Sequence, residues 1–368
     1  MATTFALVGA RVFDGRQLTG PATVVVENGL IGHDAAGAER IDVHGAVLLP
    51  GLIDAHVHVH GRESLDALAR HGVTTGLDMA AWPPELPASL RGTAGTADLQ
   101  SAGIPAIGPD GPHARMIVTT PEAVVTDAAK AGRWVADRIA EGSEYIKIVM
   151  EAPGEGGLTA EVAAALVEAA HARGRLVVAH AASAGAYTMA VDCGADRVTH
   201  CPIGAPADPA DVARLRDGGR VAIPTLTMMR GVARFAGRPE GFAGSMATVA
   251  ALHAAGVPIL AGTDANDAPA APFQVRHGQS LHEELRLLVQ AGLSPVEALR
   301  SATCLPARHF SLADRGVIAP GKRADLLLID GDPLADIAAT GGILRVWCAG
   351  IEHETAPPLS EPETVTGG

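Results

Sequence analysis

Two patterns of hydrophobic and polar positions divide the chain. From Phe5 to Leu49, short alternating runs are broken by Gly, Pro and Asp-Gly, which is typical of a small β-sheet. After Pro50, short apolar runs alternate with Ala-, Leu- and Glu-rich stretches of helical length, such as Thr159–Arg173 and Pro295–Ala302. From Val317 to Ile351 strand-like runs return, so both chain ends are expected to build one sheet domain.

The apolar runs after Pro50 predict the strands of a closed parallel barrel. Strands of such a barrel are covered on both faces, so their sequences are apolar throughout. An open doubly wound sheet is the alternative architecture. The eight predicted strands are Leu52–His58, Val73–Met79, Ile104–Ile107, Tyr145–Met150, Leu176–His180, Val198–His200, Val221–Thr225 and Pro258–Asp264.

Together the patterns predict an α/β protein, a (β/α)8 TIM barrel with a small β-sandwich domain. The barrel is expected over residues 51–312 and the sandwich over residues 1–50 and 313–355, followed by a flexible tail over 356–368. The length of 368 residues fits this division, because a barrel needs ~250 residues.

Composition and charge narrow the possible partners. The chain is 48% hydrophobic and 19% charged, which allows a sizeable core and excludes a disordered protein. A net charge of −13 without a Lys/Arg-rich run argues against nucleic acid and anionic membranes as partners. No export signal and no apolar run of ~18 residues is found. We therefore expect a cytoplasmic protein that binds a small-molecule substrate, with a homo-oligomer left open.

The four cysteines do not indicate a metal site or a disulfide framework. They lack the short paired spacing of thiolate zinc sites, and their number is too small for a dense set of disulfides. A reducing compartment suits them. The four are Cys193, Cys201, Cys304 and Cys348.

Two histidines at alternate positions of the first barrel strand suggest a metal half-site. His56 and His58 lie two residues apart, so on a strand both side chains point to the same face. Neutral imidazole binds zinc and similar ions without losing a proton. Alternating histidines can equally fill a polar strand, so the pair alone does not decide. His60 continues the alternation and is taken as a neighbour of the site.

Three further polar residues stand at the ends of later strands. His180, His200 and Asp264 each come last in a predicted strand. Any one of them alone could be a hydrogen-bonded strand end or a cap. With the first pair they place four histidines and one aspartate at the carboxyl ends of the strands, where barrel enzymes build their active sites. A metal centre is the better explanation of the set.

Lys147 lies inside the fourth predicted strand. A lysine in a strand that is covered on both faces must have its charge paired or removed. The alternative is a rim lysine that packs its aliphatic stem and keeps its ammonium in water. Because the neighbouring strands supply metal ligands, a neutralised or chemically modified lysine at the metal explains the position better.

The order of these motifs resembles the amidohydrolase superfamily, and within it the imidazolonepropionase-like and Xaa-Pro-dipeptidase-like branch. The closing stretches Ser294–Leu299 and Gly316–Leu326 resemble that family's last barrel helix and its return to the small sheet. The resemblance covers nearly the whole chain. Its motifs are Pro50–Ala55 followed by His56 and His58, Lys147 on strand four, His180 and His200 ending strands five and six, and Gly262–Asp264 ending strand eight.

The resemblance implies two divalent metal ions, with zinc the first candidate, and a carbamate formed from carbon dioxide on the lysine. Two cations would hold a hydroxide, because a metal ion lowers the pKa of bound water to near ~7. The aspartate would take up the proton of the nucleophile and return it to the leaving group. The implied ligands are His56, His58 and Asp264 for the first ion, His180 and His200 for the second, and Lys147 bridging both.

The resemblance further implies a metal-dependent hydrolase that uses the bridging hydroxide to cleave an amide, lactam or related C–N bond of a small molecule. Hydrolysis of an ester or lactone by the same mechanism, and an Xaa-Pro dipeptidase, are alternatives. A non-catalytic barrel would be expected to lack ligands, and this chain has all six. A phosphate-binding barrel needs a Gly-rich cradle, for which Met228–Gly231 is too weak a signal.

Residues that contact the substrate are less clearly marked. Dipeptidase-like members of the superfamily have a tyrosine two residues after the strand-five histidine, where this chain has Ala182, and Tyr187 is the nearest tyrosine. Uncharged amides, lactams and esters are therefore the expected substrates. His113, after strand three, is expected to reach the substrate oxygen as an electrophile, unless it is a solvated loop histidine. Cys201 and Thr227 are candidate pocket residues, with packing as the alternative.

Overall fold

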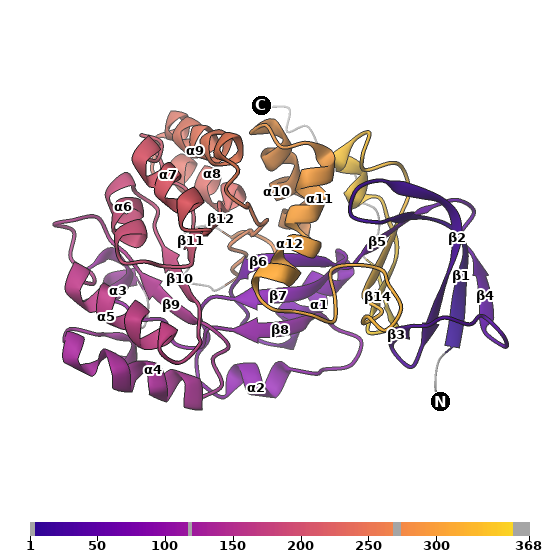
Figure 1. Ribbon diagram of the computed structural model, residues 1–368, viewed down its shortest axis with the longest axis horizontal. Helices are drawn as coiled ribbons and strands as arrows, with labels where there is room; N and C mark the ends of the chain where they lie inside the picture. The colour runs from indigo at the N-terminus through magenta and orange to yellow at the C-terminus, as the bar shows by residue number, and fades with distance from the viewer. Residues whose placement is uncertain (1–3, 117–119, 268–273, 356–368) are drawn as a thin grey trace, which may run out of the picture.

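The computed structural model describes residues 4–116, 120–267 and 274–355. A sheet made by both chain ends lies at one end of the molecule, and the helices surround the strands of a second unit (Figure 1). The tail predicted over 356–368 lies outside the described residues.

All strands of the terminal unit are hydrogen-bonded into one eight-stranded sheet. The sheet branches at its first strand, which pairs antiparallel with the second strand and parallel with two others. Side chains from both chain ends share one core, in which Phe5 stacks on Trp347. In spatial order the strands are β15 (Ile351–His353), β14 (Ile343–Cys348), β13 (Leu326–Ile329), β5 (Val47–Pro50), β1 (Thr4–Phe13), β2 (Leu18–Glu27) and β3 (Leu30–Ile31), with β4 (Glu39–Asp42) beside β1.

Seven parallel strands form most of the barrel. They are short and buried at nearly every position, as expected for strands that are covered on both faces. Six of them overlap the predicted strands to within two residues at either end. The seven are β6 (Leu52–Val57), β7 (Val73–Asp78), β8 (Asp98–Ser101), β9 (Ile146–Val149), β10 (Val177–His180), β11 (Arg197–Thr199) and β12 (Val221–Ile223).

The third strand is not where the sequence predicts it. β8 pairs with β7, whereas the predicted strand Ile104–Ile107 makes only isolated bridges, among them one from Ala106 to Ile148 of β9. The prediction was wrong because β8 alternates half-buried and buried residues and lacks a continuous apolar run. Pro105 also removes a backbone donor from the predicted segment, which prevents a regular ladder there.

The segment predicted as the eighth strand closes the barrel between β12 and β6 without forming a regular strand. The Leu260 amide donates to the Ala222 carbonyl at 2.9 Å, and the Asp264 amide donates to the His56 carbonyl at 2.8 Å. The backbones approach so closely that a Cβ on Gly262 would lie 2.6 Å from the Ile223 side chain. The close approach at this glycine and the left-handed backbone of Asp264 (φ 59°) interrupt the ladder.

The helices pack around the barrel, and two of them begin at clear N-capping residues. The Thr159 side chain caps the predicted helix at 159–173, and Ser294 and Glu297 form a capping box at the last barrel helix. Among the described helices, none is both long and apolar enough to cross a membrane. They are α1 (Arg62–Arg70), α2 (Leu86–Leu90), α3 (Pro112–Met116), α4 (Ala131–Ala140), α5 (Ala160–His171), α6 (Ala184–Asp192), α7 (Pro209–Asp217), α8 (Leu226–Phe235), α9 (Phe242–Ala255), α10 (Gln279–Gln290), α11 (Pro295–Ser301) and α12 (Cys304–His309).

Candidate active site

Four histidines and one aspartate converge at the carboxyl ends of the barrel strands. Asp264 Oδ1 lies 3.0 Å from His58 Nε2 and 3.2 Å from His56 Nε2. The other oxygen, Asp264 Oδ2, lies 3.8 Å from His200 Nδ1. The His180 ring packs edge-on against the His200 ring, with 4.2 Å between the ring centroids. The parallel strands bring together residues that are more than two hundred positions apart because their carboxyl ends share one face.

The donor atoms of this cluster fit a divalent metal ion. One potential ligand atom from each of His56, His200 and Asp264 lies within 4.8 Å of the other two. His56 Nε2 is buried and has no hydrogen-bond partner among the described residues. A buried polar atom without a partner is costly unless something binds it. Imidazole and carboxylate groups are the ligands of zinc and related ions, so the residues suit such an ion.

Burial keeps three histidines of the cluster in the neutral form that binds metal, whereas for the fourth, His58, the contact with Asp264 outweighs burial and raises the pKa. Burial lowers the pKa of His56 to about 3, and the pKa values of His180 and His200 lie well below their usual range for the same reason. Burial alone would raise the pKa of Asp264, but His56 and His58 outweigh it and hold that pKa well below its usual range. Neutral imidazoles beside an ionised carboxylate can bind a cation without releasing protons.

Lys147 lies on β9 and does not reach the surface. It is 4% exposed, and burial lowers the pKa of its amine to about 7 against the opposing charges of Asp264 and Asp78. A rim lysine would keep its ammonium in water. The amine is instead close to neutrality at the pH of a cell, which is the form that reacts with carbon dioxide.

The backbone is strained where the last three barrel strands end. His200, Thr225 and Asp264 all have positive φ angles, of 74°, 49° and 59°. Residues other than glycine seldom adopt this conformation, and a β-branched residue such as threonine does so least readily. Each instance costs about 1–3 kcal/mol and tends to occur at functional sites. The strain therefore lies at the same strand ends as the cluster.

His113 reaches the cluster from α3. Its ring packs edge-on against the His180 ring, with 4.3 Å between centroids. Glu151 Oε1 lies 2.7 Å from His113 Nδ1 and also accepts from the backbone amide of His113 at 3.2 Å. Two hydrogen bonds to one buried carboxylate hold the histidine in place, which does not fit a freely solvated loop residue.

Thr227 and Cys201, the two candidate pocket residues, each have a structural partner or a place in the core. The Thr227 hydroxyl and amide both donate to Glu284 Oε2, at 2.8 and 2.7 Å. Cys201 is fully buried in the main barrel core, and so is Tyr187. The packing alternative describes Thr227 and Cys201 better, and no tyrosine hydroxyl replaces the one that is missing after His180.

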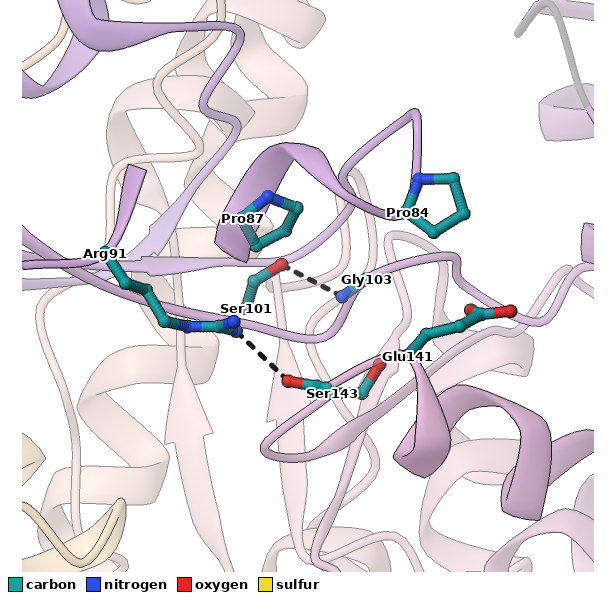
Figure 2. A pocket seen from close by; sticks show the side chains of 8 residues that line it. Pro84, Pro87, Arg91, Ser101, Gly103, Glu141 and Ser143 are labelled. Carbon is teal, nitrogen blue, oxygen red and sulfur yellow. Dashed lines mark hydrogen bonds between the residues drawn. The ribbon is translucent and has the colours of Figure 1, made fainter. Parts of the chain in front are cut away.

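A small pocket lies elsewhere, between α2, the end of β8 and the loop from α4 to β9 (Figure 2). Arg91 crosses it and donates to the Gly142 carbonyl at 3.1 Å. None of the residues of the histidine cluster lines this pocket, so it is not part of the candidate site. Its lining residues are Pro84, Pro87, Arg91, Ser101, Gly103, Glu141, Gly142 and Ser143.

Comparison with known proteins decides the family. A match to the amidohydrolase family covers residues 47–351, which includes every residue of the cluster. The chain belongs to the amidohydrolase family. It is thus a hydrolase of a family whose members act on C–N bonds, and the resemblance seen in the sequence motifs is confirmed.

The proteins to which this amidohydrolase is similar are named for different activities or for none. An uncharacterized protein of Mycobacterium tuberculosis is 29% identical over 338 residues, covering 84% of this chain and 85% of the relative. An adenine deaminase of a Methylobacterium species is 29% identical over 365 residues, covering 93% of this chain but 56% of the deaminase. The crystal structure of a Xaa-Pro dipeptidase with bound methionine has a TM-score of 0.82 at 23% identity, covering 96% of this chain and 100% of the other. That likeness shows the fold, a (β/α)8 barrel with a separate β domain.

Several residues that surround the cluster were missed from the sequence. Asp54 accepts from the His56 and Thr263 amides, and Thr199 and Thr225 hydrogen-bond two of the histidines. Asp54 lies two residues before His56, and Thr199 lies directly before His200. Their closeness to the histidines in the sequence was the signal that could have identified them. Glu284, in the middle of α10, gave no signal, because a glutamate in a helix usually faces water.

Proposed function

We propose that this amidohydrolase cleaves an amide, lactam or related C–N bond of a small molecule with the help of two divalent metal ions. The observation that supports it most is the convergence of four histidines at the strand ends, three of which lie against one ionised aspartate while the fourth packs on His200. His56, His58 and Asp264 would hold one ion and His180 and His200 the other. A carbamate on Lys147 would bridge them. Hydrolysis of an ester or lactone by the same groups is the nearest alternative.

In the proposed reaction, the metal ions, Asp264 and His113 have different roles. When bound, the metals would supply a nucleophile by lowering the pKa of a water molecule. Asp264 is ionised and can accept a proton, which it can then deliver to the nitrogen of the leaving group. Glu151 occupies Nδ1 of His113, so Nε2 is the nitrogen left to contact the substrate oxygen.

The number of metal ions provides a direct test. Protein purified without chelator and supplied with zinc and bicarbonate is expected to contain two ions per chain, because the ligands form two sets that share only Lys147. Elemental analysis measures the ratio, and hydrolysis should disappear on chelation and return with zinc. One ion or none under these conditions would contradict the binuclear proposal.

The substrate class provides a second test. Neutral amides, lactams or esters should be hydrolysed with a kcat/KM at least about tenfold higher than dipeptides with a free carboxylate. A charged group that enters a buried site without a partner loses its hydration, and the position two residues after His180 is an alanine, not a tyrosine that could offset that loss. Matched kcat/KM measurements on the metal-loaded enzyme should include amides, lactams, esters, Xaa-Pro dipeptides and adenine.

Each outcome of this panel favours a different activity. Preferred hydrolysis of Xaa-Pro dipeptides would restore the dipeptidase alternative and overturn the prediction. Release of ammonia from adenine would place the chain with the deaminases it is similar to. Hydrolysis restricted to esters would move the reaction from C–N to C–O bonds while leaving the metal centre as proposed.

A further inference from the structure

Two threonines at neighbouring strand ends hold the rings of two candidate metal ligands. Thr199 Oγ1, at the end of β11, is hydrogen-bonded to His56 Nδ1 of β6 at 2.6 Å. Thr225 Oγ1, two residues after β12, is hydrogen-bonded to His200 Nδ1 at 2.7 Å. All four residues are at most 1% exposed, so water does not compete for these hydrogen bonds.

Each hydrogen bond decides which ring nitrogen remains for a metal. A neutral imidazole carries its proton on one nitrogen and a lone pair on the other. If Nδ1 donates to a threonine oxygen, the lone pair lies on Nε2. In agreement with this, His56 Nε2 is buried without a hydrogen-bond partner among the described residues and lies 3.2 Å from Asp264 Oδ1.

The backbone directly after Thr225 is held by a residue outside the cluster. Glu284, fully buried on α10, accepts from the Leu226 amide at 2.8 Å and from the Thr227 amide at 2.7 Å. The carboxylate thereby ties down the first turn of α8, directly after Thr225. This attachment holds Thr225 in its left-handed conformation, with its hydroxyl directed at the ring of His200.

We propose that Thr199 and Thr225 are positioning residues that assign Nε2 of His56 and of His200 to the metals. The inference rests on the proposed metal-dependent function. It adds that the two threonines serve different ions, because His56 belongs to the first proposed ligand set and His200 to the second. Thr199 precedes His200 in the chain, so the end of β11 supplies a ligand to one ion and a positioning hydroxyl to the other.

The test measures metal binding, so it needs no substrate. Metal-free protein is titrated with zinc and with cobalt(II) in bicarbonate buffer, by calorimetry and by the absorption of bound cobalt. Thr199→Val and Thr225→Val keep the side-chain shape but remove the hydroxyl, and each is expected to weaken one of two ions by about 10- to 100-fold. The serine variants should restore binding, because they restore the hydroxyl.

The chain offers a matched control. Thr340 Oγ1 is hydrogen-bonded to His282 Nδ1 at 3.0 Å, and both residues are buried between α10 and the short helix Ile337–Gly341. Thr340→Val removes the same kind of hydrogen bond away from the histidine cluster. It should leave both binding constants unchanged, whatever it does to the temperature of unfolding.

The outcomes separate the inference from the function on which it rests. A wild-type protein that binds no ions would overturn both. Wild-type binding of two ions with unchanged binding in both valine variants would overturn the inference alone. Equal weakening in the Thr340→Val control, or no recovery with serine, would also overturn it, since general packing would then explain the loss. If a valine variant fails to fold, the alanine variant at the same position is titrated with the same expectation.

Discussion

Asp264→Asn is expected to reduce turnover by about 10²- to 10⁴-fold, the usual contribution of a group that transfers a proton in the transition state. An amide has the shape of a carboxylate but cannot accept the proton. The substitution should leave the fold intact, because asparagine tolerates the left-handed backbone conformation of position 264 as well as aspartate does. Steady-state kinetics and circular dichroism on the metal-loaded variant measure both expectations.

A surface aspartate provides the control for this substitution. Asp217 ends α7 with a side chain that is 66% exposed, so Asp217→Asn makes the same chemical change away from the cluster. Its turnover should equal that of the wild type. Near-normal hydrolysis by Asp264→Asn would show that another group transfers the proton, and the proposed division of work would be wrong.

Lys147→Ala is expected to lose metal content and turnover together. If a carbamate on Lys147 bridges both ions, its removal takes an anionic ligand from each of them. Short carboxylic acids such as acetate or propionate present the same two oxygens, so they should restore part of both losses. Elemental analysis and kinetics on the same samples, with and without the added acid, test the expectation.

The alternative role of Lys147 predicts the opposite result. Substitution of an exposed lysine usually changes stability by no more than ~0.5 kcal/mol and leaves a remote site intact. Lys130, with a side chain that is 76% exposed, is the matched control, and Lys130→Ala should keep both metals and full turnover. An alanine variant at 147 that behaves like this control would show that Lys147 has only a structural role.

Much of the fold and of the histidine cluster could be predicted from the sequence because both depend on local patterns. Strands covered on both faces must be apolar throughout, so six of the seven barrel strands are visible as runs. The face on which parallel strands end is common to all of them. Polar residues that end strands, such as His180, His200 and Asp264, could therefore be assigned to the carboxyl-terminal face of the barrel from the sequence alone.

Strands that have no apolar run, and hydrogen-bond partners that lie on different elements, could be identified only from the tertiary structure. Three of the four residues of β8 are polar, so no apolar run marks its position in the barrel. The eighth segment has an apolar run, but only the structure shows that isolated bridges hold it in place of a regular ladder. Thr199 reaches His56 across 143 positions, and Glu284 reaches Leu226 across 58. Threonine and glutamate lie mostly on protein surfaces, so their residue types give no sign of burial, and the partner of a buried one depends on which strands and helices become neighbours. Composition and periodicity describe one element at a time, whereas these hydrogen bonds form between elements that only the closed barrel brings together.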